Sequence, residues 1–367
     1  MKKYLTLLLA VLLAGCAAAP KTAQNALTVT GSYPLSYARE FTVDECAGGY
    51  NLLTIDGSRY LTVPAGAAVP NGLDADITIL QLPLQNIYLV STSAMDPIIR
   101  IGGLDTVALS GTQAEGWYLP EARAAMQNGE IAYAGRYSTP DYETILSAGC
   151  DLALENTMIY HTPKVKEQLE SCGIPVLVER SSYESDPLAR MEWVKLYGIL
   201  LDRQQQAEQL FDAAVQQIAP LAGQKSTGKT AAFFSITSNN LATVRKGNDY
   251  VAKMIELAGG QYVFSDLTDD GNNLATVNIS LEEFYAAAKD ADVLFYNSTI
   301  EGELHTLDEL VAKCPALADC RAVQNGQVYC TAQSLFQQSM ELPALILDMH
   351  KVFASDGGDF TFLTQLQ

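Results

Sequence analysis

The chain has 367 residues, 48% of them hydrophobic, and a formal net charge of −19. Its length is sufficient for two domains of ordinary size, and its apolar fraction excludes a largely disordered protein. The strong acidic balance argues against partners such as nucleic acid or anionic lipid headgroups, because these need a basic surface.

The first sixteen residues have the layout of a secretory signal peptide. Lys2 and Lys3 form a basic start, residues 4–12 are almost continuously apolar, and Leu-Ala-Gly-Cys16 follows. The apolar run is too short to cross a bilayer as a mature helix. The ending resembles the lipobox of bacterial lipoproteins, which implies removal of residues 1–15 and a lipid on Cys16 that anchors the exported protein to the cell membrane. The alternative is an ordinary signal peptide that is cleaved after an alanine near residues 17–19.

Six cysteines remain after Cys16: Cys46, Cys150, Cys172, Cys314, Cys320 and Cys330. An exported protein can form disulfides, but six cysteines allow fifteen pairings, so the pairing stays open. The sequence contains no C-x-x-C motif, and none of the three histidines has the spacing of a metal ligand. We therefore predict no resident metal and no cofactor.

The β-rich N-terminal segment covers residues 28–96, after an anchor and tether at residues 16–27. It contains β-branched and aromatic runs that Gly, Pro and Asp separate, and this pattern is typical of short strands. The runs are residues 41–43, 50–55, 60–63, 77–80 and 87–90. We predict a small antiparallel segment that packs on the first lobe.

The rest of the chain is predicted to form two α/β lobes. Short apolar strands alternate with helical stretches over residues 97–186 and again over 228–367, which favours mostly parallel sheets flanked by helices. Between them, apolar residues recur at helical spacing over residues 187–222. Pro187 suits the first turn of this segment and Pro220 its end, so we predict one long linking helix of roughly 50 Å.

Residues 223–230 match the phosphate-loop pattern G-x-x-x-x-G-K-[ST]. That chemistry needs a strand before the loop and a helix after it, so that helix amides face the phosphates. Here a helix precedes the loop and a strand follows, which favours a polar loop between domains. The sequence also contains no G-x-S-x-G motif, and we predict no catalytic residue and no enzymatic activity.

Two lobes joined by a helix behind a lipoprotein signal resemble the substrate-binding lipoproteins of ABC importers, in the iron-siderophore, haem and cobalamin class. The stretches that carry the resemblance are 140–154, the Gly-Ile-Pro-Val strand at 173–176, 195–211, the helix ending in Gly259-Gly260, and 279–294. The resemblance implies a periplasmic-binding-protein fold and a monomer. Such a protein captures a metal chelate (a ferric siderophore, haem or a corrinoid) and delivers it to an ABC permease and its ATPase.

The resemblance also assigns permease docking to Glu143 and Glu282, since a glutamate on each lobe of these proteins docks onto permease arginines. Charge complementarity of this kind orients a partner and speeds its association. The alternative is that both are ordinary solvated helix residues.

The ligand is expected in the cleft between the lobes, at the carboxyl ends of the strands. Aromatic side chains give flat apolar contact area, and arginine can hold a carboxylate through two parallel hydrogen bonds. First-lobe candidates are Trp117, Tyr118, Arg136, Tyr137, Glu155, Met158, Tyr160, Arg180, Ser182, Tyr183 and Glu184, with Arg190 and Trp193 at the start of the linking helix. Second-lobe candidates are Thr237, Asn239, Asn240, Arg245, Tyr296, Gln333 and Phe336.

The chain departs from this class at residues 28–95, which are longer than the usual entry to the first lobe. It also lacks a His/Asp/Glu set typical of relatives that bind bare Zn or Mn ions, which favours a metal chelate or another organic ligand over a naked cation. Two other functions stay open: an exported enzyme that processes a chelate, and a surface adhesin with the same fold. The sequence does not identify the ligand.

Overall fold

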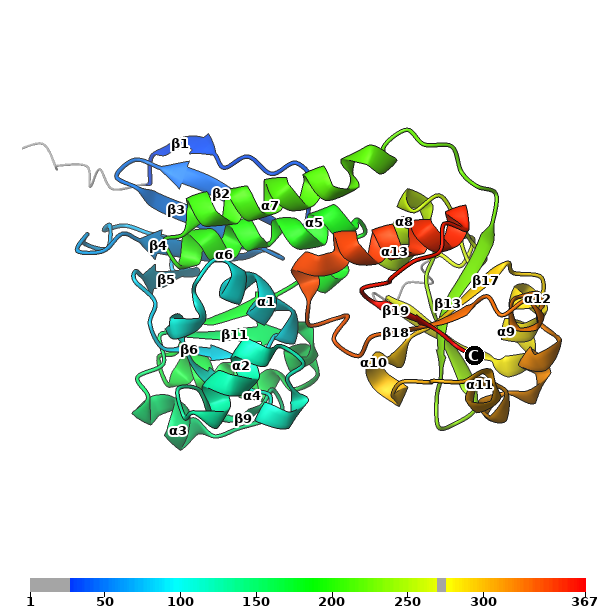
Figure 1. Ribbon diagram of the computed structural model, residues 1–367. Coiled ribbons are helices and arrows are strands. Elements are labelled where there is room, and N and C mark those ends of the chain that lie inside the picture. The colour runs from blue at the N-terminus through cyan, green and yellow to red at the C-terminus, as the bar shows by residue number, and fades with distance from the viewer. Residues whose placement is uncertain (1–26, 269–274) are drawn as a thin grey trace, which may run out of the picture.

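Figure 1 shows the computed structural model, which describes residues 27–268 and 275–367. The predicted signal peptide, Cys16 and residues 17–26 of the tether lie outside these residues. The chain forms an N-terminal β-sheet and two α/β lobes joined by helices, which confirms the predicted fold class. In the described stretches no helix is both long and apolar enough to span a bilayer.

The N-terminal sheet has five strands in the order β1-β2-β3-β4-β5. They are β1 (Val29–Ser32), β2 (Phe41–Cys46), β3 (Tyr50–Ile55), β4 (Ser58–Val63) and β5 (Ile77–Gln81). Strands β1 to β4 pair antiparallel, but β5 runs parallel to β4, so the prediction of an antiparallel segment is wrong for the last strand. A parallel pair needs a long crossover connection, and residues 64–76 provide it.

The first-lobe sheet is entirely parallel, in the order β12-β11-β6-β7-β8. Its strands are β6 (Ile87–Leu89), β7 (Val107–Ser110), β8 (Ala132–Tyr133), β11 (Leu152–Asn156) and β12 (Val176–Glu179). Strand β6 pairs with β7 and β11, so the predicted boundary at residue 96 is corrected to a point before residue 87. A fully buried apolar run such as Ile87–Leu89 is typical of a strand inside a parallel sheet.

Helices cover both faces of this sheet, as parallel strands require. They are α1 (Thr92–Arg100), α2 (Pro120–Gln127), α3 (Tyr142–Ser147) and α4 (Pro163–Ser171), with a small ribbon of β9 (Gly135–Arg136) and β10 (Thr139–Pro140). Short 3-10 turns lie at Leu104–Thr106, Ala114–Gly116, Thr157–His161 and Ser181–Tyr183.

The segment between the lobes is helical, but the prediction of one long helix over residues 187–222 is wrong. It contains α5 (Pro187–Glu192), α6 (Val194–Leu200), α7 (Gln204–Ile218) and a 3-10 turn at Ala219–Leu221. Asp202 has a φ of +55° and reverses the chain, so that α6 and α7 pack side by side (Figure 1). Gly198 permits their close approach, because a Cβ there would lie 2.6 Å from that of Ala207. All of α6 and one face of α7 are buried, so apolar residues recur on both sides of the turn and the sequence pattern does not reveal the break.

The second-lobe sheet is mixed, in the order β16-β14-β13-β17-β18-β19 with β15 beside β13. Only the pairs that β13 makes with β15 and β17, and the pair β17–β18, are parallel. The prediction of a mostly parallel sheet is therefore correct only for the central strands. The tight turn at Asn240, with a φ of +58°, folds β14 back so that it pairs antiparallel with β13. The strands are β13 (Thr230–Ile236), β14 (Leu241–Arg245), β15 (Gln261–Tyr262), β16 (Thr276–Ser280), β17 (Val293–Tyr296), β18 (Val328–Thr331) and β19 (Leu363–Gln365).

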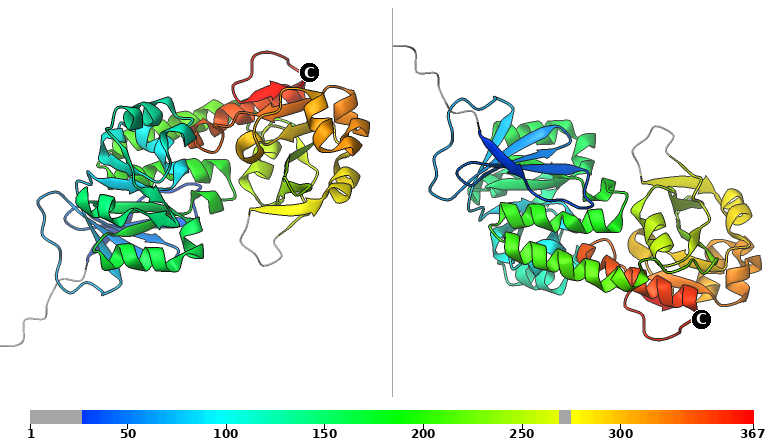
Figure 2. Two further views of the ribbon diagram at one scale, coloured as in Figure 1. Left: turned by 90° about the horizontal axis from the view of Figure 1, so that it is seen from below. Right: turned by 90° about the horizontal axis from the view of Figure 1, so that it is seen from above.

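The helices of the second lobe include α13, which runs beside the linking helices (Figures 1 and 2). They are α8 (Tyr250–Leu257), α9 (Leu281–Ala288), α10 (Ser298–Glu301), α11 (Leu307–Lys313), α12 (Arg321–Gln324) and α13 (Leu342–Ala354), with 3-10 turns at Pro315–Asp319 and Ser339–Glu341.

A segment of the second lobe returns to the first lobe before α13. The Gln337 side chain accepts a hydrogen bond from the Tyr118 amide at 2.7 Å and donates one to the Gly116 carbonyl at 2.8 Å. The Ser339 hydroxyl donates to the Ser93 carbonyl, and the Met340 amide donates to the buried Asp96 carboxylate, both at 2.8 Å. The lobes are thus held by this crossing segment as well as by the linking helices.

We predict that the lobes move little when ligand binds, because two separate connections would have to rearrange together. Small-angle X-ray scattering of the free and ligand-saturated protein should give radii of gyration that differ by less than about 1 Å, as for pre-organised complexes. A decrease of several ångströms on binding would contradict this prediction and indicate hinge closure.

Candidate functional site

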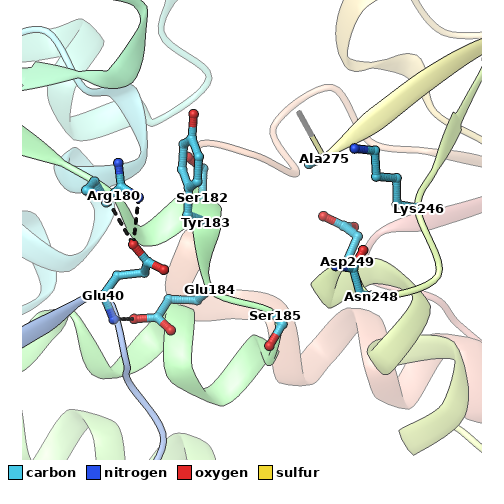
Figure 3. Close-up of a pocket in the computed structure, with 10 residues that line it drawn as sticks. All are labelled: Glu40, Arg180, Ser182, Tyr183, Glu184, Ser185, Lys246, Asn248, Asp249 and Ala275. Carbon is cyan, nitrogen blue, oxygen red and sulfur yellow. Dashed lines mark hydrogen bonds and ion pairs between the residues drawn. The ribbon is translucent and has the colours of Figure 1, made fainter. Parts of the chain in front are cut away.

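Two adjoining hollows form a cleft between the lobes, one of which is drawn in Figure 3. They measure about 220 and 320 Å³ and share Ser182, Tyr183 and Ala275. Together they fall in the range of small-molecule sites, ~300–1,000 Å³. The first-lobe wall lies at the carboxyl ends of β6, β11 and β12, as the position of ligand sites in open α/β sheets predicts.

The first-lobe floor of the cleft is organised by Glu179, the last residue of β12. Its carboxylate accepts hydrogen bonds from the hydroxyls of Ser91 and Ser93, at 2.9 and 3.1 Å, and from the Ser181 amide at 2.7 Å. Both serines lie at the start of α1 and line the cleft, as does Asn156 at the end of β11. These contacts fix a polar set of hydroxyl and amide groups around the Glu179 carboxylate on this side.

Two arginines and two aromatic rings form the opposite wall. The Arg190 guanidinium from α5 lies over the ring of Tyr250 at 4.8 Å, and that of Arg245 lies over Phe336 at 4.9 Å and Tyr250 at 5.6 Å. Arg245 also pairs with Asp249 at 3.5 Å. Burial alone would lower the pKa of Arg245, but Asp249 raises it above its usual value, so this guanidinium stays charged. The wall offers positive charge next to flat apolar surface.

Eight of the candidate ligand-binding residues line the cleft: Met158, Arg180, Ser182, Tyr183, Glu184, Arg190, Arg245 and Phe336. They come from the turns after β11 and β12, the start of the linking helices, the end of β14 and the segment after β18. The structure thus brings together residues that are separated by up to half of the chain.

Three predicted ligand contacts are wrong, because their side chains are fully buried. Trp117 packs into the first lobe and its indole N–H donates to Ser110, while Tyr296 lies inside the second-lobe core. Glu155 points to the same face of β11 as Ala153, away from solvent. All three follow or end strands, as the sequence indicated, but strand position does not say which way a side chain points.

The remaining predicted contacts lie outside the two hollows. Arg136 is exposed at the end of β9 and Asn239 is exposed on a turn. Tyr137 packs on the outer cluster of the first lobe, the apolar residues around Ile145, Ala153 and Leu169. Tyr118 lies beside the crossing segment, and Tyr160 is half-exposed on the 3-10 turn after β11. Trp193 is buried, and Thr237, Asn240 and Gln333 are also absent from the cleft lining.

The sequence reasoning missed several residues of the cleft. They are Ser91, Thr92, Ser93, Asn156, Thr157, Glu179, Lys246, Asn248, Asp249 and Tyr250. A signal for the first group existed, because Ser-Thr-Ser directly follows the apolar run at residues 87–90. It was missed because that run was assigned to the N-terminal segment rather than to the first lobe.

The six cysteines of the described residues are free thiols, so no disulfide joins them. Burial raises the pKa of Cys150 and of Cys320 to about 11, which makes both thiols poor nucleophiles at neutral pH. Within residues 27–268 and 275–367, no group of three or more His, Cys, Asp or Glu could hold a metal ion.

The two glutamates predicted to dock a permease are exposed, one on each lobe. Glu143 lies in the first turn of α3, behind the capping residue Asp141, and Glu282 lies in the first turn of α9, behind Ser280. Negative side chains at helix N-termini are favourable, which is the ordinary structural reason for finding them there.

Comparison with known proteins defines the class of this chain. The family model described as a periplasmic binding protein matches residues 98–335, and the chain therefore belongs to this family of solute-binding proteins. The match begins inside α1 and leaves the N-terminal sheet outside it.

Individual relatives agree with this family. An uncharacterised lipoprotein of Methanocaldococcus jannaschii is 24% identical over 305 residues, which are 80% of this chain and 72% of that protein. A periplasmic haem-binding protein of Pseudomonas aeruginosa has a TM-score of 0.61 at 17% identity, covering 77% of this chain and 98% of its own. A structure from the ABC-type Fe3+-hydroxamate transport system of Saccharomonospora viridis has a TM-score of 0.56 at 21% identity, covering 74% and 93%. At these identities the structural likeness shows the fold.

Proposed function

We propose that this protein captures a metal chelate outside the cytoplasm and delivers it to an ABC import permease and its ATPase. The chelate is a ferric siderophore, haem or a corrinoid, and the protein acts as a monomer without catalysing a reaction. The observation that carries the proposal is the interlobe cleft, whose wall combines Arg190 and Arg245 with the rings of Tyr250 and Phe336. Solved neighbours of the same fold are described as haem-binding or as parts of iron-hydroxamate transport.

The chemistry of the cleft favours a flat or bulky ligand that carries acidic groups. Aromatic rings supply apolar contact area, and a guanidinium can hold a carboxylate or a similar oxyanion through two parallel hydrogen bonds. The guanidinium groups of Arg190 and Arg245 lie 4.8 and 5.6 Å from the centre of the Tyr250 ring, and two neighbouring guanidinium groups suit a ligand with more than one acidic group. The Ser and Asn groups of the first lobe can hydrogen-bond to its remaining polar atoms.

Membrane attachment through a lipid on Cys16 is the second part of the proposal. It is supported by the Leu-Ala-Gly-Cys sequence and by the relative of M. jannaschii, which is described as a lipoprotein. The tether at residues 16–27 would keep the binding protein near its permease.

Docking through Glu143 and Glu282 leads to a specific prediction. Changing both residues to lysine should slow association with the permease about tenfold or more at low salt, because charge complementarity acts mainly on the association rate. The measurement is the association rate on permease in nanodiscs. Glu121→Lys, an exposed site on α2, is the control and should leave the rate near that of the wild type. Equal rates for the double variant and the control would refute docking through these two glutamates.

A thermal-shift screen tests the proposed function. The protein without residues 1–16 is mixed with ferric siderophores, haem, cobalamins and free metal ions. Binding to the native state raises the melting temperature, by an amount equivalent to about 2.7 kcal/mol at a ligand concentration of 100 Kd. We expect a shift with one chelate class and none with free metal ions. No shift with any chelate, in protein shown to be folded, would contradict the proposed function.

A further inference from the structure

The N-terminal β-sheet, which lies outside the matched family region, contacts the wall of the cleft. The residues between β1 and β2 lie against α5 and against the turn before it. The amides of Ser36, Tyr37 and Ala38 donate to the Glu192 carboxylate at 2.7–3.0 Å. Those of the next two residues, 39 and 40, donate to Glu184 at 3.0–3.1 Å. Five successive amides therefore bind two carboxylates of the cleft-forming segment.

Both carboxylates are almost completely removed from water, with Glu192 0% and Glu184 4% exposed. Buried charges need such partners, because an unpaired one costs several kcal/mol. Burial raises the pKa of Glu192, but the Lys195 ammonium at 2.7 Å and the three amides outweigh it, so the pKa is lowered. The N-terminal segment thus fixes the piece of chain that carries Tyr183 and Arg190.

The same sheet reaches the cleft itself through Glu40, as Figure 3 shows, while Asp56, in the turn between β3 and β4, contacts the cleft residue Arg180. The Arg180 guanidinium lies 2.8–2.9 Å from the Glu40 carboxylate and 3.0 Å from that of Asp56. Its central carbon lies 4.4 Å from the centre of the Tyr183 ring. Burial alone would lower the pKa of Arg180, but Glu40 and Asp56 raise it, so this guanidinium stays charged.

We propose that the N-terminal β-sheet contributes to ligand binding by positioning side chains of the cleft wall. Glu40 and Asp56 are positioning residues: they hold the planar Arg180 fork in one orientation, and Arg180 in turn holds the Tyr183 ring at the cleft surface. Ligand affinity therefore depends on side chains that the family's matched region does not contain. The effect on affinity rests on the proposed function, whereas the positioning of Tyr183 does not.

The test combines Glu40→Gln with Asp56→Asn. A matched control combines Asp74→Asn with Asp76→Asn, which removes the ion pairs of Arg59 in the same sheet, away from the cleft. The first measurement is amide hydrogen exchange over residues 180–185 in the free protein. We expect exchange there to become about tenfold faster in the first variant, because local opening tracks the loss of local contacts. The control should match the wild type at these amides.

The second measurement is an absorbance titration with haem as the probe. The first variant should bind haem about tenfold more weakly than the control, and Glu40→Asp, which keeps the charge, should recover most of the affinity. Unchanged exchange over residues 180–185, or equal haem affinity in both variants, would overturn the proposal. If haem does not bind the wild type, the exchange result alone decides the positioning, and the failed titration counts against haem as the chelate of the proposed function.

Discussion

Changing Arg190 to Gln should weaken binding of an acidic chelate about 10- to 150-fold, because a hydrogen bond to a charged group contributes about 1.5–3 kcal/mol. Arg190 lines the cleft and stacks on Tyr250, and no ion pair joins it to another described residue. Calorimetric titration with the chelate found in the thermal-shift screen gives the change in Kd directly.

Two further variants sharpen this prediction. Arg245→Lys keeps the positive charge beside Asp249 but removes the planar guanidinium group, which can donate two parallel hydrogen bonds. The variant should therefore bind ligand more weakly while the fold is maintained. Arg136→Gln changes an exposed arginine that lies outside the cleft and should bind like the wild type. If Arg136→Gln reduced affinity and Arg190→Gln did not, the ligand site would not be the interlobe cleft.

Glu155 should make the protein less stable as the pH rises from about 4.5 to 8. It is completely buried, neither carboxylate oxygen has a hydrogen-bond partner, and its neighbours form the apolar outer cluster of the first lobe. Burial raises its pKa from 4.5 to about 8. Between these values the native state keeps the proton and the unfolded state loses it, so the free energy of unfolding falls as the pH rises.

Changing Glu155 to Gln removes this titration and keeps the shape of the side chain. Above pH 8 the variant should be more stable than the wild type by about 3–5 kcal/mol, since each pKa unit corresponds to ~1.4 kcal/mol. At pH 4 the two proteins should differ little. Urea unfolding between pH 4 and 9 measures this, with Glu256→Gln on the surface of α8 as the control. Parallel pH profiles for wild type and Glu155→Gln would contradict the assignment.

The sequence predicted the two-lobed fold because apolar strands and helices alternate visibly along both halves. It could not show the break in the linking segment, since all of α6 is buried and α7 buries one face, so that apolar residues recur on both sides of Asp202. The mixed pairing of the second-lobe sheet depends on the turn at Asn240 and on strands that are distant in sequence.

Site prediction succeeded where position along a strand was sufficient and failed where side-chain direction mattered. Arg180, Tyr183 and Arg245 follow or end strands that point into the cleft. Glu155 also lies near the end of a strand, but a parallel strand is covered on both faces, so alternation does not reveal its direction. The contact of Glu40 with Arg180 joins residues 140 positions apart in the sequence, and no local sequence pattern predicts it.

Native mass spectrometry tests the central claim most directly. The protein without residues 1–16 is mixed with an equimolar pool of ferric siderophores, haem and cobalamin. We expect a single 1:1 adduct in the wild type, and strong loss of that adduct in Arg190→Gln but not in Arg136→Gln. No adduct at all, or one that persists equally in both variants, would contradict capture of a chelate in the interlobe cleft.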